Sequence, residues 1–134
     1  MLEFKMFSAL LSYPTSEMRA ALDEMAGLIE RSPLIAPAER PGLLALIASL
    51  GEGDLLDAEE RYCELFDRGR ALSLHLFEHL HGESRDRGTA MVELKQLYRA
   101  AGFDLVGNEL PDYLPVVLEY LSCRELPEAR DMLV

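Results

Sequence analysis

The fold class is decided most clearly by residues 54–66, which read DLLDAEERYCELF. The stretch opens with Asp54, and aspartate is one of the residue types preferred at a helix N-cap. Five apolar side chains then recur at the spacing of one helical face, at Leu55, Ala58, Tyr62, Leu65 and Phe66. The pattern predicts an amphipathic helix that ends in Asp67-Arg68-Gly69.

Three further helices are expected on the N-terminal side of this stretch. The first covers residues 4–11 and stops at Tyr13-Pro14, because proline disfavours helical geometry in the residue before it. Thr15 or Ser16 caps the second helix, which continues to Ser32-Pro33. The third helix carries apolar residues over 43–50 and is closed by Gly51, which we expect to be a left-handed C-cap.

Three to four helices are expected on the C-terminal side. A short helix spans about 71–81, and the next one breaks at Gly102. Another begins near Pro111 and keeps Pro115 in or near its first turn, where proline is tolerated. Pro127 opens a last helix of barely two turns before the chain stops. Sustained strand-like alternation is absent, so we predict an all-α, single-domain bundle of about seven to eight helices over residues 1–134.

Size and charge restrict the classes of partner. A chain of 134 residues suits one domain, and its formal charge of −11 would repel phosphate backbones, so we expect no nucleic-acid partner. Acidic residues concentrate over 52–64 and again over 104–131, either as solvated helix faces or as a surface that attracts a basic partner. No apolar run approaches the ~18 residues of a membrane span, and the N-terminus lacks a secretory signal pattern. We therefore expect a cytoplasmic protein without direct membrane insertion.

The residue patterns of enzymes and metal sites are weak. His75 and His79 stand at i and i+4 of the predicted helix over 71–81, a separation at which two imidazoles can share a metal ion. Two ligands alone make a weak site, and Glu78 with His81 forms only one of the two Glu-x-x-His elements that a di-iron bundle needs. No nucleophile elbow and no phosphate-binding glycine pattern occurs. We expect a binding protein with no catalytic residue, no metal and no cofactor.

Five arginines flank the fourth and fifth predicted helices, at Arg61, Arg68, Arg70, Arg85 and Arg87. Either their guanidinium groups pair with nearby carboxylates and fix loops, or they bind a carboxylate or phosphate in two-pronged geometry. We assign Arg87 mainly to the first role and place Arg70 closer to a binding surface. Tyr62, Phe66 and Phe77 are close by in the sequence, and they belong either to the core or to a binding surface.

Three segments carry a family resemblance. Residues 60–66, ERYCELF, resemble the Glu-x-Tyr-x-x-Leu-Phe signature of molybdoenzyme-maturation chaperones. The continuation over 66–71 and 76–88 is similar to the NarJ family, which is the nitrate reductase delta subunit family. Residues 109–121, with ELPDYLP at their start, resemble the later signature of that family. Where relatives commonly have Asp-His, this chain has Asp112-Tyr113.

The resemblance implies a helical chaperone that binds the N-terminal segment of the apo catalytic (alpha) subunit of respiratory nitrate reductase in the cytoplasm. It further implies support for insertion of molybdenum cofactor and an iron-sulfur cluster before membrane docking. Family members usually extend past residue 134, so their last helices are expected to be missing here. The resemblance points to five groove or groove-support positions: Tyr62, Leu65, Phe66, Phe77 and Tyr113.

Two alternatives stay open at this stage. In place of a nitrate reductase chaperone, the sequence also fits a non-catalytic helical adaptor or a signal-peptide-binding chaperone for another molybdoenzyme. Its oligomeric state does not follow from the sequence.

Overall fold

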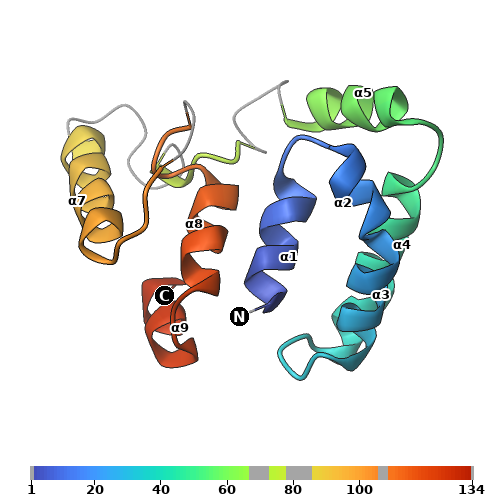
Figure 1. Cartoon of the computed structure of the whole chain (residues 1–134), viewed down its shortest axis with the longest axis horizontal. Helices are drawn as coiled ribbons and strands as arrows, with labels where there is room; N and C mark the ends of the chain where they lie inside the picture. The colour runs from blue at the N-terminus through green and yellow to red at the C-terminus, as the bar shows by residue number, and fades with distance from the viewer. Residues whose placement is uncertain (1, 67–72, 78–85, 106–108, 134) are drawn as a thin grey trace. The chain divides into compact units, whose positions relative to one another are not determined.

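The structure is a computed structural model that describes residues 2–66, 73–77, 86–105 and 109–133 (Figure 1). Within these residues the regular structure is helical, with eight α-helices, one short 3₁₀ helix and a single isolated β-bridge between His75 and Tyr113. The prediction of an all-α chain is confirmed. None of the described helices combines the length and apolar character that a membrane crossing requires.

The helices follow one another in the order α1 (Leu2–Leu11), α2 (Ser16–Ala20), α3 (Leu22–Arg31), η1 (Pro37–Glu39), α4 (Arg40–Leu50), α5 (Leu55–Phe66), α7 (Asp86–Ala100), α8 (Leu114–Ser122) and α9 (Leu126–Leu133). The chain divides into two compact units, each of which packs mainly against itself. Unit 1 comprises Met1–Leu11 with Gly69–Val134, and unit 2 comprises Ser12–Arg68. The single domain expected over residues 1–134 stays a prediction.

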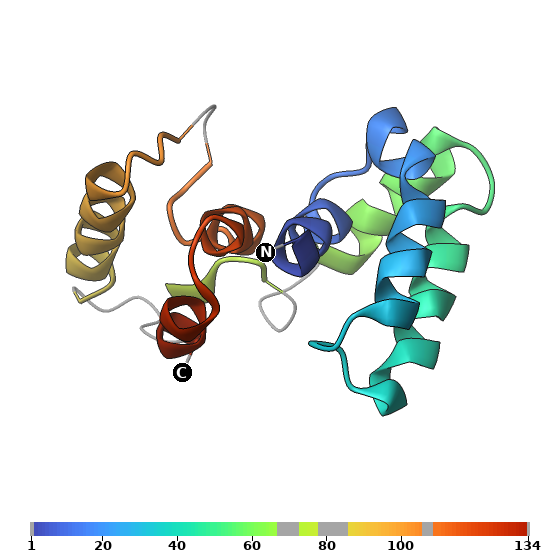
Figure 2. The ribbon, with the colours of Figure 1, turned by 60° about the horizontal axis from the view of Figure 1, so that its bottom comes forward.

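Unit 2 is built around α3 and α4, which run side by side (Figures 1 and 2). The hydroxyl oxygen of Thr15 accepts a hydrogen bond from the Met18 amide at 3.1 Å, which confirms the predicted cap. The single helix predicted from this cap to Ser32 is wrong, because the helix breaks at Ala21 (φ −93°, ψ 0°). There the Ala21 amide bonds to the Met18 carbonyl at 3.1 Å, which tightens the last turn of α2.

The turn between α4 and α5 is fixed by Arg19 of α2 and by two aspartates at the start of α5. Arg19 donates hydrogen bonds to the carbonyl oxygens of Leu50, Gly51 and Gly53, at 3.3, 3.1 and 2.6 Å. Gly51 has φ −86°, so the left-handed cap predicted there is wrong; the left-handed residue is Gly53, with φ +69°. The Asp54 and Asp57 carboxylates each accept the other residue's amide, at 2.9 and 3.1 Å, which confirms Asp54 as the cap of α5.

Unit 1 has its core among α7, α8 and α9. The fully or nearly fully buried members of this core are Leu94, Tyr98, Val117, Tyr120, Leu121 and Ala129. The rings of Tyr98, Phe103 and Tyr120 pack with centroids 4.8–5.6 Å apart, and α1 lies along α8 (Figures 1 and 2). The hydroxyl of Ser8 joins these two helices by donating to the Pro115 carbonyl at 2.6 Å.

Gly53 provides a test of the α4–α5 turn. A Cβ at this residue would lie 2.3 Å from an Asp57 carboxylate oxygen, and its φ of +69° is unfavourable for any side chain. We expect Gly53→Ala to lower the free energy of unfolding by about 1–2 kcal/mol, the usual cost of left-handed backbone for an L-residue.

The matched control is Gly42→Ala in α4, where a Cβ meets nothing within 4 Å. This change should raise the stability by up to about 1 kcal/mol, because alanine restricts the unfolded chain. Urea unfolding of both variants measures the difference. Equal losses in the two variants would contradict the assigned turn geometry.

Candidate functional site

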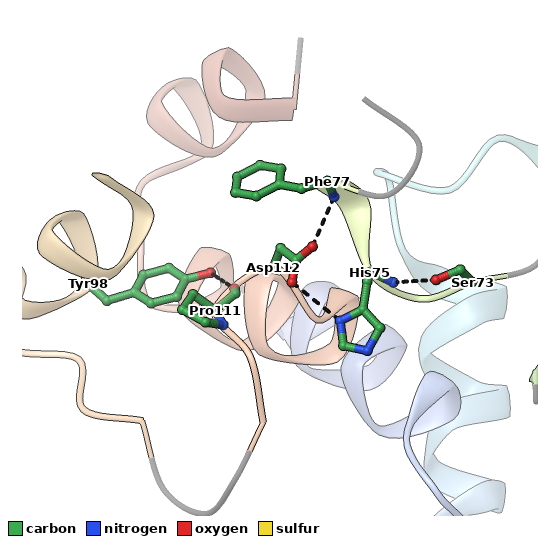
Figure 3. Close-up of polar contacts among 6 residues, drawn as sticks. All are labelled: Ser73, His75, Phe77, Tyr98, Pro111 and Asp112. Carbon is green, nitrogen blue, oxygen red and sulfur yellow. Dashed lines mark hydrogen bonds and ion pairs between the residues drawn. The ribbon is translucent and has the colours of Figure 1, made fainter. Parts of the chain in front are cut away.

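A buried carboxylate lies at the centre of a polar cluster in unit 1 (Figure 3). Asp112 has no exposed surface, and its Oδ2 accepts a hydrogen bond from the Phe77 amide at 3.0 Å. Its Oδ1 lies 3.3 Å from Nδ1 of His75. The Asp112 carbonyl also accepts from the Leu76 amide at 3.1 Å, so both its backbone and its side chain hold the same segment.

These hydrogen bonds explain why the helix predicted over 71–81 is wrong at its first described residues. Residues 73–75 are not helical, and helical geometry begins only at Leu76 and Phe77. The chain is held beside Tyr113 by the β-bridge from His75, and the Leu114 amide donates to the Leu74 carbonyl at 2.6 Å. Backbone hydrogen bonds from residues 73–75 to the distant segment around Tyr113 thus replace the hydrogen bonds that these residues would form within a helix.

The same cluster delays the start of α8. The sequence predicts a helix from near Pro111, but α8 begins at Leu114 with Tyr113 as its N-cap. The Tyr98 hydroxyl donates to the Pro111 carbonyl at 2.8 Å and so anchors the turn from α7. Burial, followed by the proximity of Tyr120 and Asp112, raises the pKa of Tyr98 well above its ordinary value, so its hydroxyl stays a neutral donor.

Tyr113 and Phe77, both predicted binding positions, have different environments. The Tyr113 ring lies against the His75 imidazole, with centroids 5.3 Å apart and an interplanar angle of 35°, and both side chains are half-buried. Phe77 packs against the hydrophobic core of unit 1. The imidazole beside Asp112 therefore comes from His75, which lies 37 positions away, while position 113 contributes a phenol.

The sequence offered His75 and His79 only as a weak metal pair, and of these two histidines only His75 lies within the described residues. His75 sits in the non-helical segment, and His79 lies outside the described residues, as do Glu78 and His81. Among the residues that the structure does describe, no group of three or more His, Cys, Asp or Glu side chains is placed to hold a metal ion.

The other predicted positions lie on α5 in unit 2. The Tyr62 ring meets the Tyr13 ring edge-on, with centroids 5.5 Å apart, and packs against Phe66 at 4.8 Å. Both Tyr62 and Phe66 are half-buried, whereas Leu65 is 51% exposed. Phe66 and Tyr62 thus form a ring cluster with Tyr13, and Leu65 projects from the same helix toward solvent.

The arginines divide between described and undescribed parts of the chain. Arg61 donates to the Glu52 carbonyl at 2.9 Å, which is the loop-fixing role considered for this group. Arg87 is half-buried. Arg70, the arginine assigned to the binding surface, lies outside the described residues, as do Arg68 and Arg85.

Two surface depressions include residues that the sequence-based site omitted. A groove of about 290 Å³ on α5 is lined by Tyr13, Leu56, Glu59, Glu60, Cys63 and Glu64. A larger one of about 670 Å³ is lined by residues of α7 and by residues 103–105 and 109–111, and it combines apolar side chains with the cations Lys95 and Arg99 and the carboxylates Asp104 and Glu109. The sequence signal for the first groove was Leu56, an apolar residue that lies outside the main apolar stripe of its helix. In the structure, Leu56 is 61% exposed.

Comparison with known proteins gives a consistent set of matches. The family model described as nitrate reductase delta subunit matches residues 14–132. The nitrate reductase molybdenum cofactor assembly chaperone NarJ of Escherichia coli K12 is 46% identical over 129 residues, which are 96% of this chain and 54% of that protein. The probable assembly chaperone NarW of the same strain is 42% identical over 130 residues, covering 97% and 53%.

A third relative comes from another organism. The probable nitrate reductase molybdenum cofactor assembly chaperone NarJ of Bacillus subtilis 168 is 33% identical over 129 residues, which are 96% of this chain and 69% of that protein. The chain spans about half the length of the two Escherichia coli relatives.

Asp112 provides the test of the polar cluster. We expect Asp112→Ala to lower the free energy of unfolding by about 1–3 kcal/mol, because it leaves the Phe77 amide without its acceptor. Asp112→Asn should cost less, since its amide oxygen still accepts from that amide. Urea unfolding beside the exposed-site control Asp104→Ala measures the effect. A loss no larger in Asp112→Ala than in Asp104→Ala would contradict the central role of this carboxylate.

Proposed function

This chain belongs to the nitrate reductase delta subunit family, and we propose on that basis that it is an assembly chaperone for a nitrate reductase catalytic subunit. In this proposal it binds the N-terminal segment of the apo catalytic subunit in the cytoplasm. It thereby supports insertion of molybdenum cofactor and an iron-sulfur cluster before the enzyme docks at the membrane. The support is the match over residues 14–132, which includes the whole of α5 and the residues hydrogen-bonded around Asp112.

The proposed mode of binding is capture of an amphipathic helix on an apolar surface. Such recognition uses apolar anchors one helical turn apart, set against a preformed surface on the partner. The observation that carries this mode is α5, whose half-buried ring cluster of Tyr62 and Phe66 supports exposed leucines on two sides. Leu65 lies on one flank of this helix, and Leu56 lies with Tyr13 on the other.

The proposal also gives a role to the remaining predicted positions, which are Tyr113, Phe77 and Arg70. Tyr113 offers a partly exposed ring, whose position is fixed by the α8 N-terminus and the His75 contact. Phe77 supports the core beneath this part of unit 1. We keep Arg70 as a proposed contact for an acidic group of the client.

The proposal assigns the chain a binding role without catalysis. The alternative is an adaptor or a chaperone for another molybdoenzyme, and client specificity separates the two. Peptides from the catalytic subunits of nitrate reductase and of an unrelated molybdoenzyme would be compared at the same salt concentration. Preference for the second peptide would favour the alternative.

We predict that the N-terminal peptide of the co-encoded catalytic subunit binds with a negative heat capacity change, because the contact removes apolar surface from water. Replacing two of the peptide's apolar residues with serine should weaken binding more than tenfold, since each buried side chain contributes about 1.5–3 kcal/mol. Isothermal titration calorimetry at three temperatures measures both quantities.

The control is a peptide of equal length and charge from the interior of the same subunit. Equal affinity for the two peptides, or a heat capacity change of zero, would contradict this mode of binding.

A further inference from the structure

Helix α4 is almost free of charge in a chain that is otherwise strongly charged. Charged residues make up 28% of the sequence, yet α4 contains none after its first residue, Arg40. The Arg40 guanidinium is directed into the turn before the helix, where Nη2 donates to the carbonyl oxygens of Ser32 and Ile35 at 3.2 and 3.4 Å. The helix is therefore neutral from Pro41 to Leu50.

The solvent-facing side of α4 is a patch of exposed, uncharged residues that we call the neutral face. It consists of Pro41, Gly42, Ala45, Leu46 and Ala48. Their spacings of three and four positions place them on one side of the helix. Leu46 is 41% exposed, and a Cβ added at Gly42 would meet nothing within 4 Å. The other side of α4, where Ile47 is buried, packs against α3 (Figures 1 and 2).

The neighbouring helix α3 shows the contrast with an ordinary solvent-facing side. Every exposed residue of α3 is charged, and these residues are Asp23, Glu24, Glu30 and Arg31. A helix that is apolar all round, as α4 is, normally lies buried in a larger structure. Single exposed apolar residues need no explanation, but a whole helix side without charge is typical of an interaction surface.

Charge and side-chain size favour a second copy of this chain as the occupant of the neutral face. A basic segment finds no carboxylate on this face, and the formal charge of −11 repels anionic partners and anionic membranes. Two copies also repel each other, but their neutral faces can meet without bringing like charges into contact. Gly42, Ala45 and Ala48 have small side chains or none, which allows two helix axes to approach to about 8 Å.

We propose that two copies of this chain associate through their neutral faces, with the two α4 helices antiparallel and crossing at Ala45. A two-fold contact uses the same surface on both copies, so Ala45 lies beside Ala45 of the second copy. An 11-residue helix is about 17 Å long, and a contact between two such helices is smaller than the interface of a stable dimer. The association is therefore weak, and it does not depend on the proposed chaperone function.

The charges around the neutral face determine how salt acts on the dimer. Glu39 and Glu52 are exposed just before and just after α4, and each copy carries a formal charge of −11. These charges oppose the approach of two copies, and dissolved salt screens them. Salt should therefore strengthen this contact, whereas it weakens a contact that is held by ion pairs.

The experiment is sedimentation equilibrium of the full chain from about 10 µM to about 1 mM, in about 0.05 M and about 0.5 M sodium chloride. The interface variants are Ala45→Glu and Ala45→Lys. The matched controls are Gln96→Glu and Gln96→Lys, which place the same charges at an exposed position of α7. Thermal melts confirm that every variant is folded.

We expect the wild type to dimerise with a Kd on the order of 0.1 mM, and about threefold more tightly in high salt. Ala45→Glu and Ala45→Lys should each weaken the dimer by about tenfold or more, because each places two like charges face to face. An equimolar mixture of these two variants should recover wild-type association to within about twofold, since the two charges then attract each other. The Gln96 variants, alone or mixed, should stay within about twofold of the wild type.

The proposal is overturned if the wild type stays monomeric at the highest concentration in high salt. It is equally overturned if Ala45→Glu associates as well as the wild type, because another surface then holds the dimer. A mixture that associates no better than its two components would rule out the two-fold contact at Ala45.

Phosphatidylcholine vesicles test a lipid surface as the other apolar occupant. We expect the wild type to stay in solution when these vesicles are sedimented. Co-sedimentation of the wild type that is lost in Ala45→Glu and kept in Gln96→Glu would assign the neutral face to lipid and overturn the proposed dimer.

Discussion

The placement of one buried carboxylate governs the larger of the two units. Removing a carboxylate from water is costly unless other hydrogen-bond donors replace the water molecules. For Asp112 those donors are the Phe77 amide and the His75 ring, 35 and 37 positions earlier in the chain. The segment over 73–77 must therefore lie against the turn before α8 whenever Asp112 is buried. This requirement overrides the helical tendency of that segment and sets where α8 begins.

Both units use hydrogen bonds to fix turns, and each turn positions a surface. In unit 1, the turn that carries Asp112 is held at Pro111 by the Tyr98 hydroxyl and at Pro115 by the Ser8 hydroxyl, and it presents Tyr113 at the N-terminus of α8. In unit 2, Arg19 binds three carbonyl groups of the turn that leads into α5. The reciprocal cap of Asp54 then fixes the first residue of the helix, and with it the orientation of both flanks of α5.

The sequence predicts those features that depend on neighbouring residues. The caps at Thr15 and Asp54 and the break at Gly102 were all recognisable because each uses a side chain or a glycine within a few positions. The break at Ala21 was not, since alanine is the best helix former and carries no local stop signal. The non-helical geometry of residues 73–75 depends on contacts with Asp112, a carboxylate more than 30 positions away. The sequence motif likewise located α5 as a candidate, but the groove also needs Tyr13, which contacts Glu59 from 46 positions away.

The pairing of α1 with α8 constrains the order in which the chain can fold during synthesis. Ser8 and Pro115 are 107 positions apart, so α1 leaves the ribosome long before its partner helix exists. The intervening unit 2 is built from near neighbours such as α3 and α4, whose contacts close short loops and form quickly. Contacts between distant positions carry a larger loop-closure cost and form later. Unit 2, with α5, can thus fold before α8 is synthesised, whereas α1 can pair with α8 only afterwards.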